Sequence, residues 1–344
     1  PALDDFAEAV ELEPDPNERV RGQLTRAAIL ASRERYREAL QIVSDLPPTA
    51  TDPTVVLQVA VQRGALLAAV GRLDAAIAQL EIALRLADDQ GDTDTRARVL
   101  VDLGAIYETV GRGDEAIVGY EEAADITRSG PIAHAALLNL GRWYVADCRP
   151  RAALEAFERV AAAAEDDRDA RASAFLARGN AALRFQRFGQ ALADFERVLT
   201  LQPSRSLQDQ AEAGLRTTRH HLDHIATMRD ELTRLGRAPE EPSFRAGPML
   251  QRGVLAMQAG DSDAAIVDVT RAIDLYRLAP DKATAHAHLA LVHAHRGECH
   301  EAGEQLYLAD EMTTDREWLL ALSGEPDWRN CIDSDWFSEY FPDF

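Results

Sequence analysis

The stretch LVDLGAIYETVGRGDEAIVGYEEA (100–123) decides the fold, because its spacing of small and aromatic residues recurs twice downstream. The other two copies read LLNLGRWYVADCRPRAALEAFERV (137–160) and FLARGNAALRFQRFGQALADFERV (175–198). In each copy a glycine precedes an alanine by twelve residues and an aromatic residue by sixteen: Gly104, Ala116 and Tyr120; Gly141, Ala153 and Phe157; Gly179, Ala191 and Phe195. A period of about 37 residues predicts stacked helix-turn-helix units, each too small to bury a core alone.

Alignment on the alanine extends the repeat over most of the chain. The alanines are Ala2, Ala39, Ala76, Ala116, Ala153, Ala191, Ala265 and Ala302. The interval from Ala191 to Ala265 covers two periods. The copy between them, 208–244, therefore has the length of a repeat but lacks the glycine, alanine and aromatic positions, and it is either a degenerate repeat or one long helix. The first copy, 2–14, matches only the second helix of a repeat, and we expect its partner helix upstream of Pro1.

The predicted fold is therefore all-α, a right-handed superhelical α-solenoid of about eight helical hairpins. We expect five segments. They are the second helix of a truncated repeat (1–16), five repeats (20–206), a degenerate repeat or long helix with a linker (207–244), two further repeats (245–313), and a C-terminal helix with an acidic-aromatic cap or tail (314–344).

The spacing of glycine, alanine and aromatic residues resembles that of the tetratricopeptide repeat, in a bacterial-type array with longer repeats. The resemblance implies that the first helix of each hairpin lines a concave groove. Register then places on or beside that groove Arg98, Leu138, Asn139, Arg142, Leu176, Asn180, Leu183 and Arg184. The earlier copies contribute Arg21, Leu24, Ala28, Gln58 and Val61.

These groove residues suit an acidic or extended peptide. The planar guanidinium of arginine matches a carboxylate, and an asparagine amide can pair with a peptide backbone. The arrangement is similar to the carboxylate clamp of chaperone-binding tetratricopeptide domains, but Leu138 and Leu176 stand where that clamp has lysine. We therefore expect a preference for acidic peptides and not for chaperone tails. The alternative is that the arginines pair with acidic residues of neighbouring repeats.

Composition limits the kinds of partner. The chain has 58 acidic and 37 basic residues, a net charge of −21, which disfavours nucleic acid and anionic membranes. Its three cysteines, Cys148, Cys299 and Cys331, are odd in number and far apart. They predict reduced thiols and a cytoplasmic protein.

The C-terminal stretch EPDWRNCIDSDWFSEYFPDF (325–344) differs from the rest of the chain, with six acidic residues and one arginine. Two interpretations stay open. It is a cap over the last repeat, or it is a peptide ligand for a groove of this chain or of another copy. Its aromatic residues are Trp328, Trp336, Phe337, Tyr340, Phe341 and Phe344.

The sequence offers no catalytic motif. It lacks a nucleophile elbow and a phosphate-binding glycine loop, and the pair His220 and His224 reads as a solvated helix face. We predict a binding scaffold, with no enzymatic activity, catalytic residue, metal or cofactor. The alternatives are a regulatory sensor region of a larger multidomain signalling or effector protein, and self-assembly through the N-terminal half-repeat or the C-terminal tail.

Overall fold

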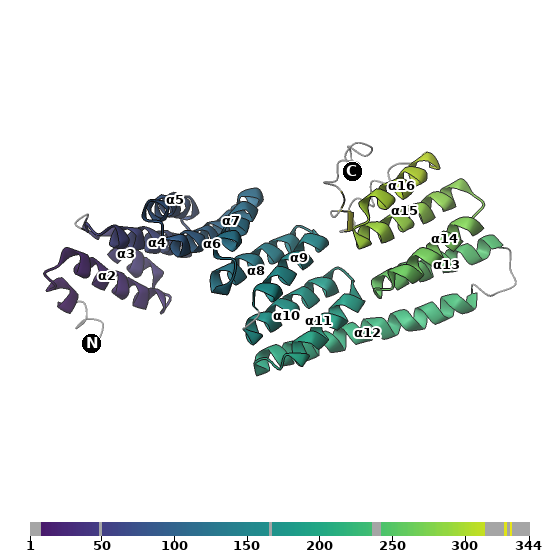
Figure 1. Cartoon of the computed structure of the whole chain (residues 1–344), viewed down its shortest axis with the longest axis horizontal. Helices are drawn as coiled ribbons and strands as arrows, with labels where there is room; N and C mark the ends of the chain where they lie inside the picture. Colours follow the sequence, from purple (N-terminus) through teal and green to yellow (C-terminus); the bar gives the residue numbers. More distant parts are fainter. Residues whose placement is uncertain are drawn as a thin grey trace. The chain divides into compact units, whose positions relative to one another are not determined.

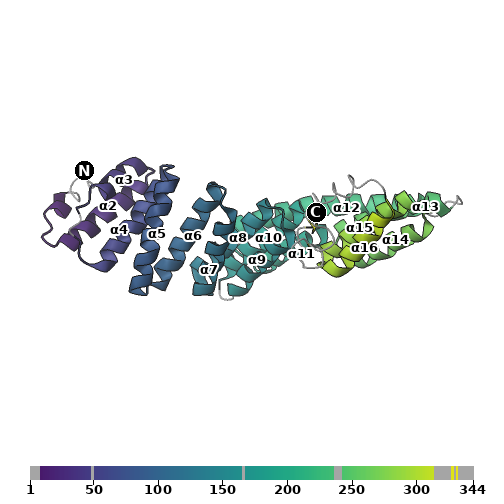
Figure 2. The same ribbon diagram turned by 90° about the horizontal axis from the view of Figure 1, so that it is seen from above.

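The computed structural model describes residues 8–47, 50–164, 167–235, 242–313, 327–328 and 331. Within 242–313, the side chains are described from residue 244 onward. These residues form α-helices joined by short turns, with no strand among them (Figures 1 and 2). Successive helices pack as antiparallel hairpins, so the prediction of an all-α array of helical hairpins is confirmed.

The chain divides into two units, Pro1–Leu140 and Gly141–Phe344, and the boundary falls within α8 (Gly130–Ala146). The helices before α8 are α2 (Pro16–Ala31), α3 (Tyr36–Ser44), α4 (Pro53–Ala69), α5 (Leu73–Gln90), α6 (Thr93–Thr109) and α7 (Gly113–Thr127). Those after it are α9 (Pro150–Ala163), α10 (Arg168–Arg184), α11 (Phe188–Thr200), α12 (Arg205–Leu235), α13 (Pro242–Gln258), α14 (Ser262–Leu275), α15 (Ala279–Arg296) and α16 (Cys299–Glu311).

The first helix of a hairpin begins at an aspartate cap in several repeats. The side chains of Asp15, Asp52 and Asp92 accept hydrogen bonds from backbone N–H groups of the first turns of α2, α4 and α6. Proline follows the cap in α2 and α4, where the missing N–H is not needed. These caps fix the residue at which each of these first helices begins, at the same place in each repeat.

Each of the three quoted hairpins is closed by a glycine packed against an aromatic ring. A Cβ added at Gly141 would lie 2.5 Å from the Phe157 ring, which is closer than any real contact. The ring itself is almost fully buried. The same arrangement joins Gly104 to Tyr120, Gly141 to Phe157 and Gly179 to Phe195.

Most of the predicted degenerate copy lies in one helix of 31 residues, α12. It packs against α10 and α11 with one part and against α13 with another (Figure 1). The hairpins α10–α11 and α13–α14 also meet at their turns. Gln258 donates a hydrogen bond to Gln186 over 2.7 Å, and a Cβ at Gly189 would lie 2.3 Å from the Ala259 carbonyl oxygen.

The start of the C-terminal stretch caps the last hairpin. Trp328 is fully buried among residues of α15 and α16, including Leu291 and Leu306. This burial agrees with the interpretation of 325–344 as a cap, which stays a prediction for the stretch as a whole. Its other aromatic residues, Trp336, Phe337, Tyr340, Phe341 and Phe344, lie outside the described part of the chain.

The prediction that all three cysteines are reduced is wrong. Cys299, at the first position of α16, forms a disulfide with Cys331, and their Cα atoms are 5.1 Å apart. Cys148 is the free cysteine. Folding of the cap onto α16 brings together two residues that are 32 positions apart, so the separation in sequence gave no guide to pairing. The inference of a cytoplasmic protein from unpaired thiols loses its basis.

Asp327 connects the cap to a distant hairpin. Its carboxylate accepts a hydrogen bond from Arg187 at 2.5 Å and lies 3.1 Å from Nδ1 of His295. Burial alone would raise the pKa of Asp327, but the hydrogen bond with His295 and the positive charge of Arg187 outweigh it and lower the pKa. The buried aspartate is therefore held in its charged form.

A side chain at Gly141 tests the hairpin packing. We expect Gly141→Val to destabilise the protein by about 1–3 kcal/mol, because the new methyl groups overlap the Phe157 ring. Thermal unfolding followed by circular dichroism measures the loss. Ala135→Val, at an exposed site of α8, is the control and should change little. Failure of Phe157→Leu to relieve the Gly141→Val defect would contradict the assigned contact.

The bridge of Asp327 predicts a dependence of stability on pH. Its pKa is lower in the folded protein than the ~3.9 of an unfolded chain. The bridge therefore stabilises the protein above about pH 4, and this contribution is lost as the pH falls through the lower folded value. Asp327→Asn should lower the melting temperature at about pH 7 by several degrees, and this loss should shrink progressively as the pH is lowered below about 4. A loss that stays the same down to the lowest pH at which the protein folds would show that the charge is irrelevant.

Candidate functional site

A groove in the first unit is built from the first helices of three hairpins. It has a volume of about 520 Å³ and lies across α2, α4 and α6. Six positions that the repeat register assigns to the inner face line it, and the remaining lining residues are mostly hydroxyl or amide side chains. The full lining is Arg21, Leu24, Thr25, Ala28, Thr54, Leu57, Gln58, Val61, Gln62, Asp92, Thr95 and Arg98.

Charges in this groove are partly compensated. Arg21 contacts Asp52 at 2.7 Å and Glu18 at 2.5 Å, so its charge is neutralised. Arg98 is exposed and donates a hydrogen bond to the Thr95 hydroxyl at 3.1 Å. Hydrogen bonds from the Thr95 hydroxyl and backbone N–H lower the pKa of Asp92, with a smaller effect from the Arg98 charge. Arg98 is the groove cation that remains open to a ligand.

The α8 residues predicted for the site are half-buried in the first unit. Leu138 and Asn139 are both partly covered. The Asn139 amide lies near the Tyr120 phenol, whose pKa is raised by burial and by the neighbouring Glu108 carboxylate, while Asn139 acts in the opposite direction. Asn139 thus neighbours the aromatic core of its repeat as well as the inner face.

The second unit presents a separate group of predicted site residues. Arg142 on α8 and Asn180 and Arg184 on α10 are exposed, Leu183 is half-buried and Leu176 is buried. Asn180 and Arg184 are four residues apart on one helix, so they share a face. The eight predicted residues therefore divide between the two units.

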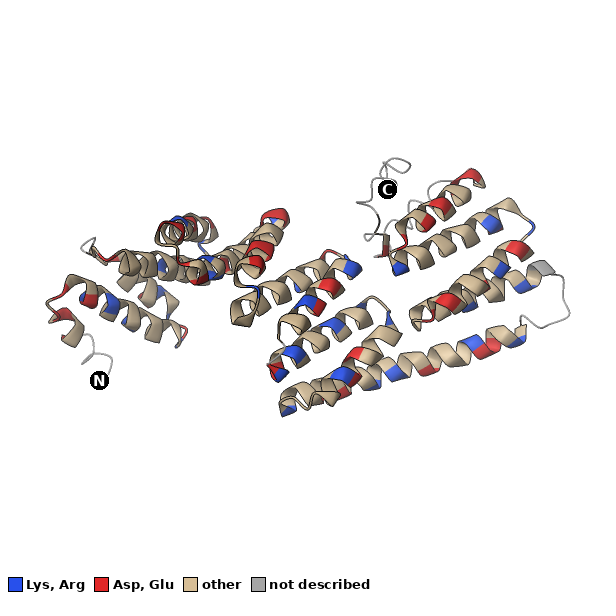
Figure 3. Cartoon of the chain, in the orientation of Figure 1, with Lys and Arg blue, Asp and Glu red and all other residues tan. Residues whose placement is uncertain are grey.

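The groove arginines are not paired with acidic residues of neighbouring repeats. In the described part of the chain, Arg142 and Arg184 make no ion pair, and neither does Arg98. Acidic and basic side chains are nevertheless interspersed along the helices of both units (Figure 3). An exposed arginine that stays unpaired in so acidic a chain is available to a ligand.

Two other arginines, the buried Arg178 and the half-buried Arg252, each pair with a buried aspartate, and sequence reasoning missed them. Arg178 donates to both carboxylate oxygens of Asp194, at 2.9 and 2.6 Å, and Arg252 holds Asp268 in the same way. In each pair the arginine stands just before the glycine of its repeat. The aspartate follows sixteen positions later, just before the position that is aromatic in the quoted copies. That recurrence in two copies is the signal that would have identified them.

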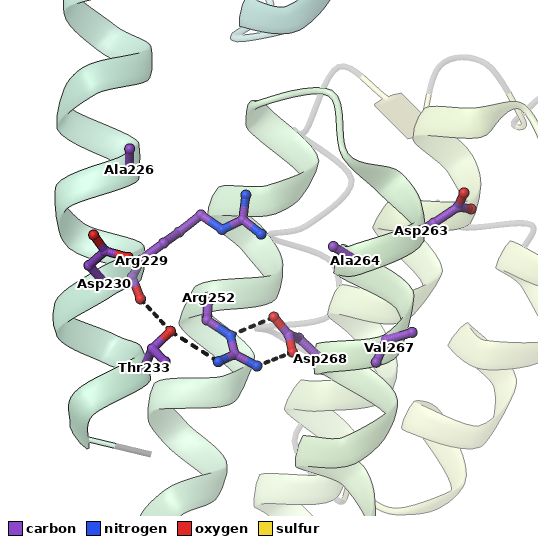
Figure 4. A pocket seen from close by; sticks show the side chains of 9 residues that line it. All are labelled: Ala226, Arg229, Asp230, Thr233, Arg252, Asp263, Ala264, Val267 and Asp268. Carbon is purple, nitrogen blue, oxygen red and sulfur yellow. Dashed lines mark hydrogen bonds and ion pairs between the residues drawn. The ribbon is translucent and has the colours of Figure 1, made fainter. Parts of the chain in front are cut away.

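A second hollow, of about 580 Å³, lies between α12, α13 and α14. Arg252 crosses it, donating to Asp268 on one side and to the Thr233 hydroxyl at 3.1 Å on the other (Figure 4). Arg229 lies 3.7 Å from Asp261. Both arginines of this hollow pair with aspartates, so neither has an unpaired guanidinium like that of Arg98.

Stacked helical hairpins with an inner groove define the class of helical-repeat proteins. Within it, models of the tetratricopeptide repeat match residues 55–129 and 250–312. These two segments are tetratricopeptide repeats within the array of helical hairpins. Proteins of this family generally mediate protein–protein interactions and act as scaffolds without enzymatic activity.

Several solved structures are similar in fold at low sequence identity. BtubC from P. vanneervenii is 19% identical, covering 58% of this chain and 86% of that one, with a TM-score of 0.47. A putative kinesin light chain from Podosopora anserina is 20% identical over 55% and 97%, with a TM-score of 0.47. The apo quorum sensor NprR from B. thuringiensis is 11% identical over 79% and 80%, with a TM-score of 0.49. No curated protein matches the chain.

Across the described parts of the chain, no helix combines the length and the apolar content needed to cross a membrane.

The buried arginine pairs predict a large effect of removing one partner. Arg178→Met leaves the Asp194 carboxylate, which is almost fully buried, without its bidentate partner. We expect a loss of about 3–5 kcal/mol in unfolding free energy, measured by denaturant titration. The double variant Arg178→Met/Asp194→Leu should recover most of it. Arg205→Met removes an exposed ion pair and is the control. A similar small loss for both arginines would contradict the assignment.

Proposed function

We propose that this protein is an interaction scaffold that binds an acidic, extended peptide segment of a partner protein along the inner faces of its first helices. The observation that carries the proposal is the contrast between its arginines. Arg178 and Arg252 are neutralised by buried aspartates, whereas Arg98, Arg142 and Arg184 are exposed without an ion pair among the described residues.

The rest of the inner face supports this assignment. In the first unit, Gln58 is exposed in the groove with the exposed Ala28 and the half-buried Val61, so a peptide would find an amide for its backbone and apolar contact area for its side chains. In the second unit, Asn180 offers the same amide next to Arg184. A mixed lining of this kind suits binding of about micromolar strength, near −8 kcal/mol.

Peptide selection followed by charge reversal tests the proposal. Peptides selected from a random display library on the wild-type protein should be enriched in aspartate and glutamate. Their affinity, measured by calorimetry, should fall at least about tenfold for Arg98→Glu or for Arg142→Glu/Arg184→Glu, since hydrogen bonds to charged groups contribute about 1.5–3 kcal/mol. The two variants report separately on the two units.

Matched controls use exposed arginines on second helices. Arg37→Glu on α3 changes the net charge by the same amount as Arg98→Glu, and Arg37→Glu combined with Arg271→Glu on α14 matches the double variant; both positions lie away from the inner face. They should alter the affinity less than about twofold once the long-range charge is screened by salt. Selected peptides without acidic residues, or equal losses in groove and control variants, would contradict the proposal.

A further inference from the structure

The described residues of the C-terminal cap, Asp327, Trp328 and Cys331, are here called the latch residues. Two of them hold the last hairpin, because Trp328 is buried among the side chains of α15 and α16 and Cys331 is bonded to Cys299. The third, Asp327, holds His295 on α15 and Arg187 at the start of α11. The latch therefore connects two hairpins that are far apart in the sequence.

The partner of Arg187 sets it apart from arginines in the same repeat position. Arg35 and Arg112 also stand just before a second helix, and each pairs with a glutamate three residues later. Their side chains are 48% and 47% exposed. Arg187 has Gln190 at that place, its side chain is 10% exposed, and its carboxylate partner is Asp327, 140 residues away. Arg187 thus binds a carboxylate of the latch, where Arg35 and Arg112 bind a carboxylate of their own helix.

A direct contact also joins the hairpin α10–α11 to a different hairpin, α13–α14. The turn before α11 touches the turn before α14 through Gln186 and Gln258 and through the close approach of Gly189 to Ala259. These contacts are few and lie at turns. The bridge from Arg187 through Asp327 to His295 is the buried, charged contact between α10–α11 and the last hairpin.

We propose that the Cys299–Cys331 disulfide is a redox-controlled lock on this latch, so that reduction releases Asp327 from Arg187 and uncouples the last hairpin from α10–α11. The disulfide closes a loop between positions 32 apart and keeps Trp328 and Asp327 near their sites. Once the bond is cut, the latch residues must be held by noncovalent contacts alone, and the open state gains chain entropy.

The reductant is a dithiol. One of its thiolates attacks Sγ of Cys299, which is half-buried, whereas Cys331 is fully buried. The disulfide breaks, and Cys331 leaves as a thiolate and takes up a proton. The second thiol of the reductant then attacks the mixed disulfide, so Cys299 leaves as a thiol and the reductant becomes a cyclic disulfide. Two electrons pass from the dithiol to the cysteine pair.

Release has two consequences at different places. At the last hairpin, departure of Trp328 uncovers apolar side chains of α15 and α16, including Leu291 and Leu306. At the turn before α11, Arg187 loses its carboxylate. The last hairpin is then free to move relative to α10–α11 and to present its apolar face.

Hydrogen exchange measured by mass spectrometry tests the lock. The full chain carries Cys148→Ser, so that the pair under study is the only one, and is compared after oxidised glutathione and after dithiothreitol. Alkylation should count no free thiol in the first sample and two in the second. Reduction should speed exchange at least about tenfold both in α15–α16 and in the turn 185–189. Two free thiols after oxidation, or exchange that is unchanged by reduction, would overturn the proposal.

Two variants separate the lock from the bridge. Cys331→Ser should show the fast exchange without reductant and no further response to dithiothreitol. Asp327→Asn, with the disulfide intact, should speed exchange in 185–189 and leave α15–α16 protected. Fast exchange in α15–α16 alone after reduction would show that the disulfide holds the cap without coupling it to Arg187, and would overturn the coupling.

Discussion

The close approach of a glycine to an aromatic ring is the constraint on which each hairpin depends. At Gly104, Gly141 and Gly179 the ring of the second helix occupies the space that a Cβ would need. Because the ring of the second helix packs directly on the backbone of the first helix at this glycine, the other faces of the first helix are left for the neighbouring repeat and for the groove. The same contact therefore sets both the core and the position of the inner face.

Much of this organisation could be predicted from the sequence, because it rests on local spacing. The glycine, alanine and aromatic positions gave the hairpins, and register placed Arg98 beside Gln58 and Val61 in one groove. Contacts between distant parts of the chain could not be predicted in the same way. The pairing of Cys299 with Cys331 and of Arg187 with Asp327 depends on how the cap folds back, which no repeat spacing encodes.

Arginine has three different environments in this acidic protein. Arg178 and Arg252 each pair with a buried aspartate, and Arg187 pairs with Asp327 of the C-terminal cap. Arg98 and Arg184 lie exposed on first helices and make no ion pair among the described residues. A chain with a net charge of −21 repels most acidic surfaces, so binding of an acidic segment would have to be local to these arginines.

The most direct measurement is the hydrogen-exchange footprint of a bound acidic peptide on the wild-type protein. The proposed mode of binding predicts slower exchange in first helices, namely α4 and α6 in one unit or α10 in the other. It predicts no change in the second helices α5, α7 and α11. Protection confined to second helices, or to the hollow between α12 and α14, would contradict recognition on the inner face.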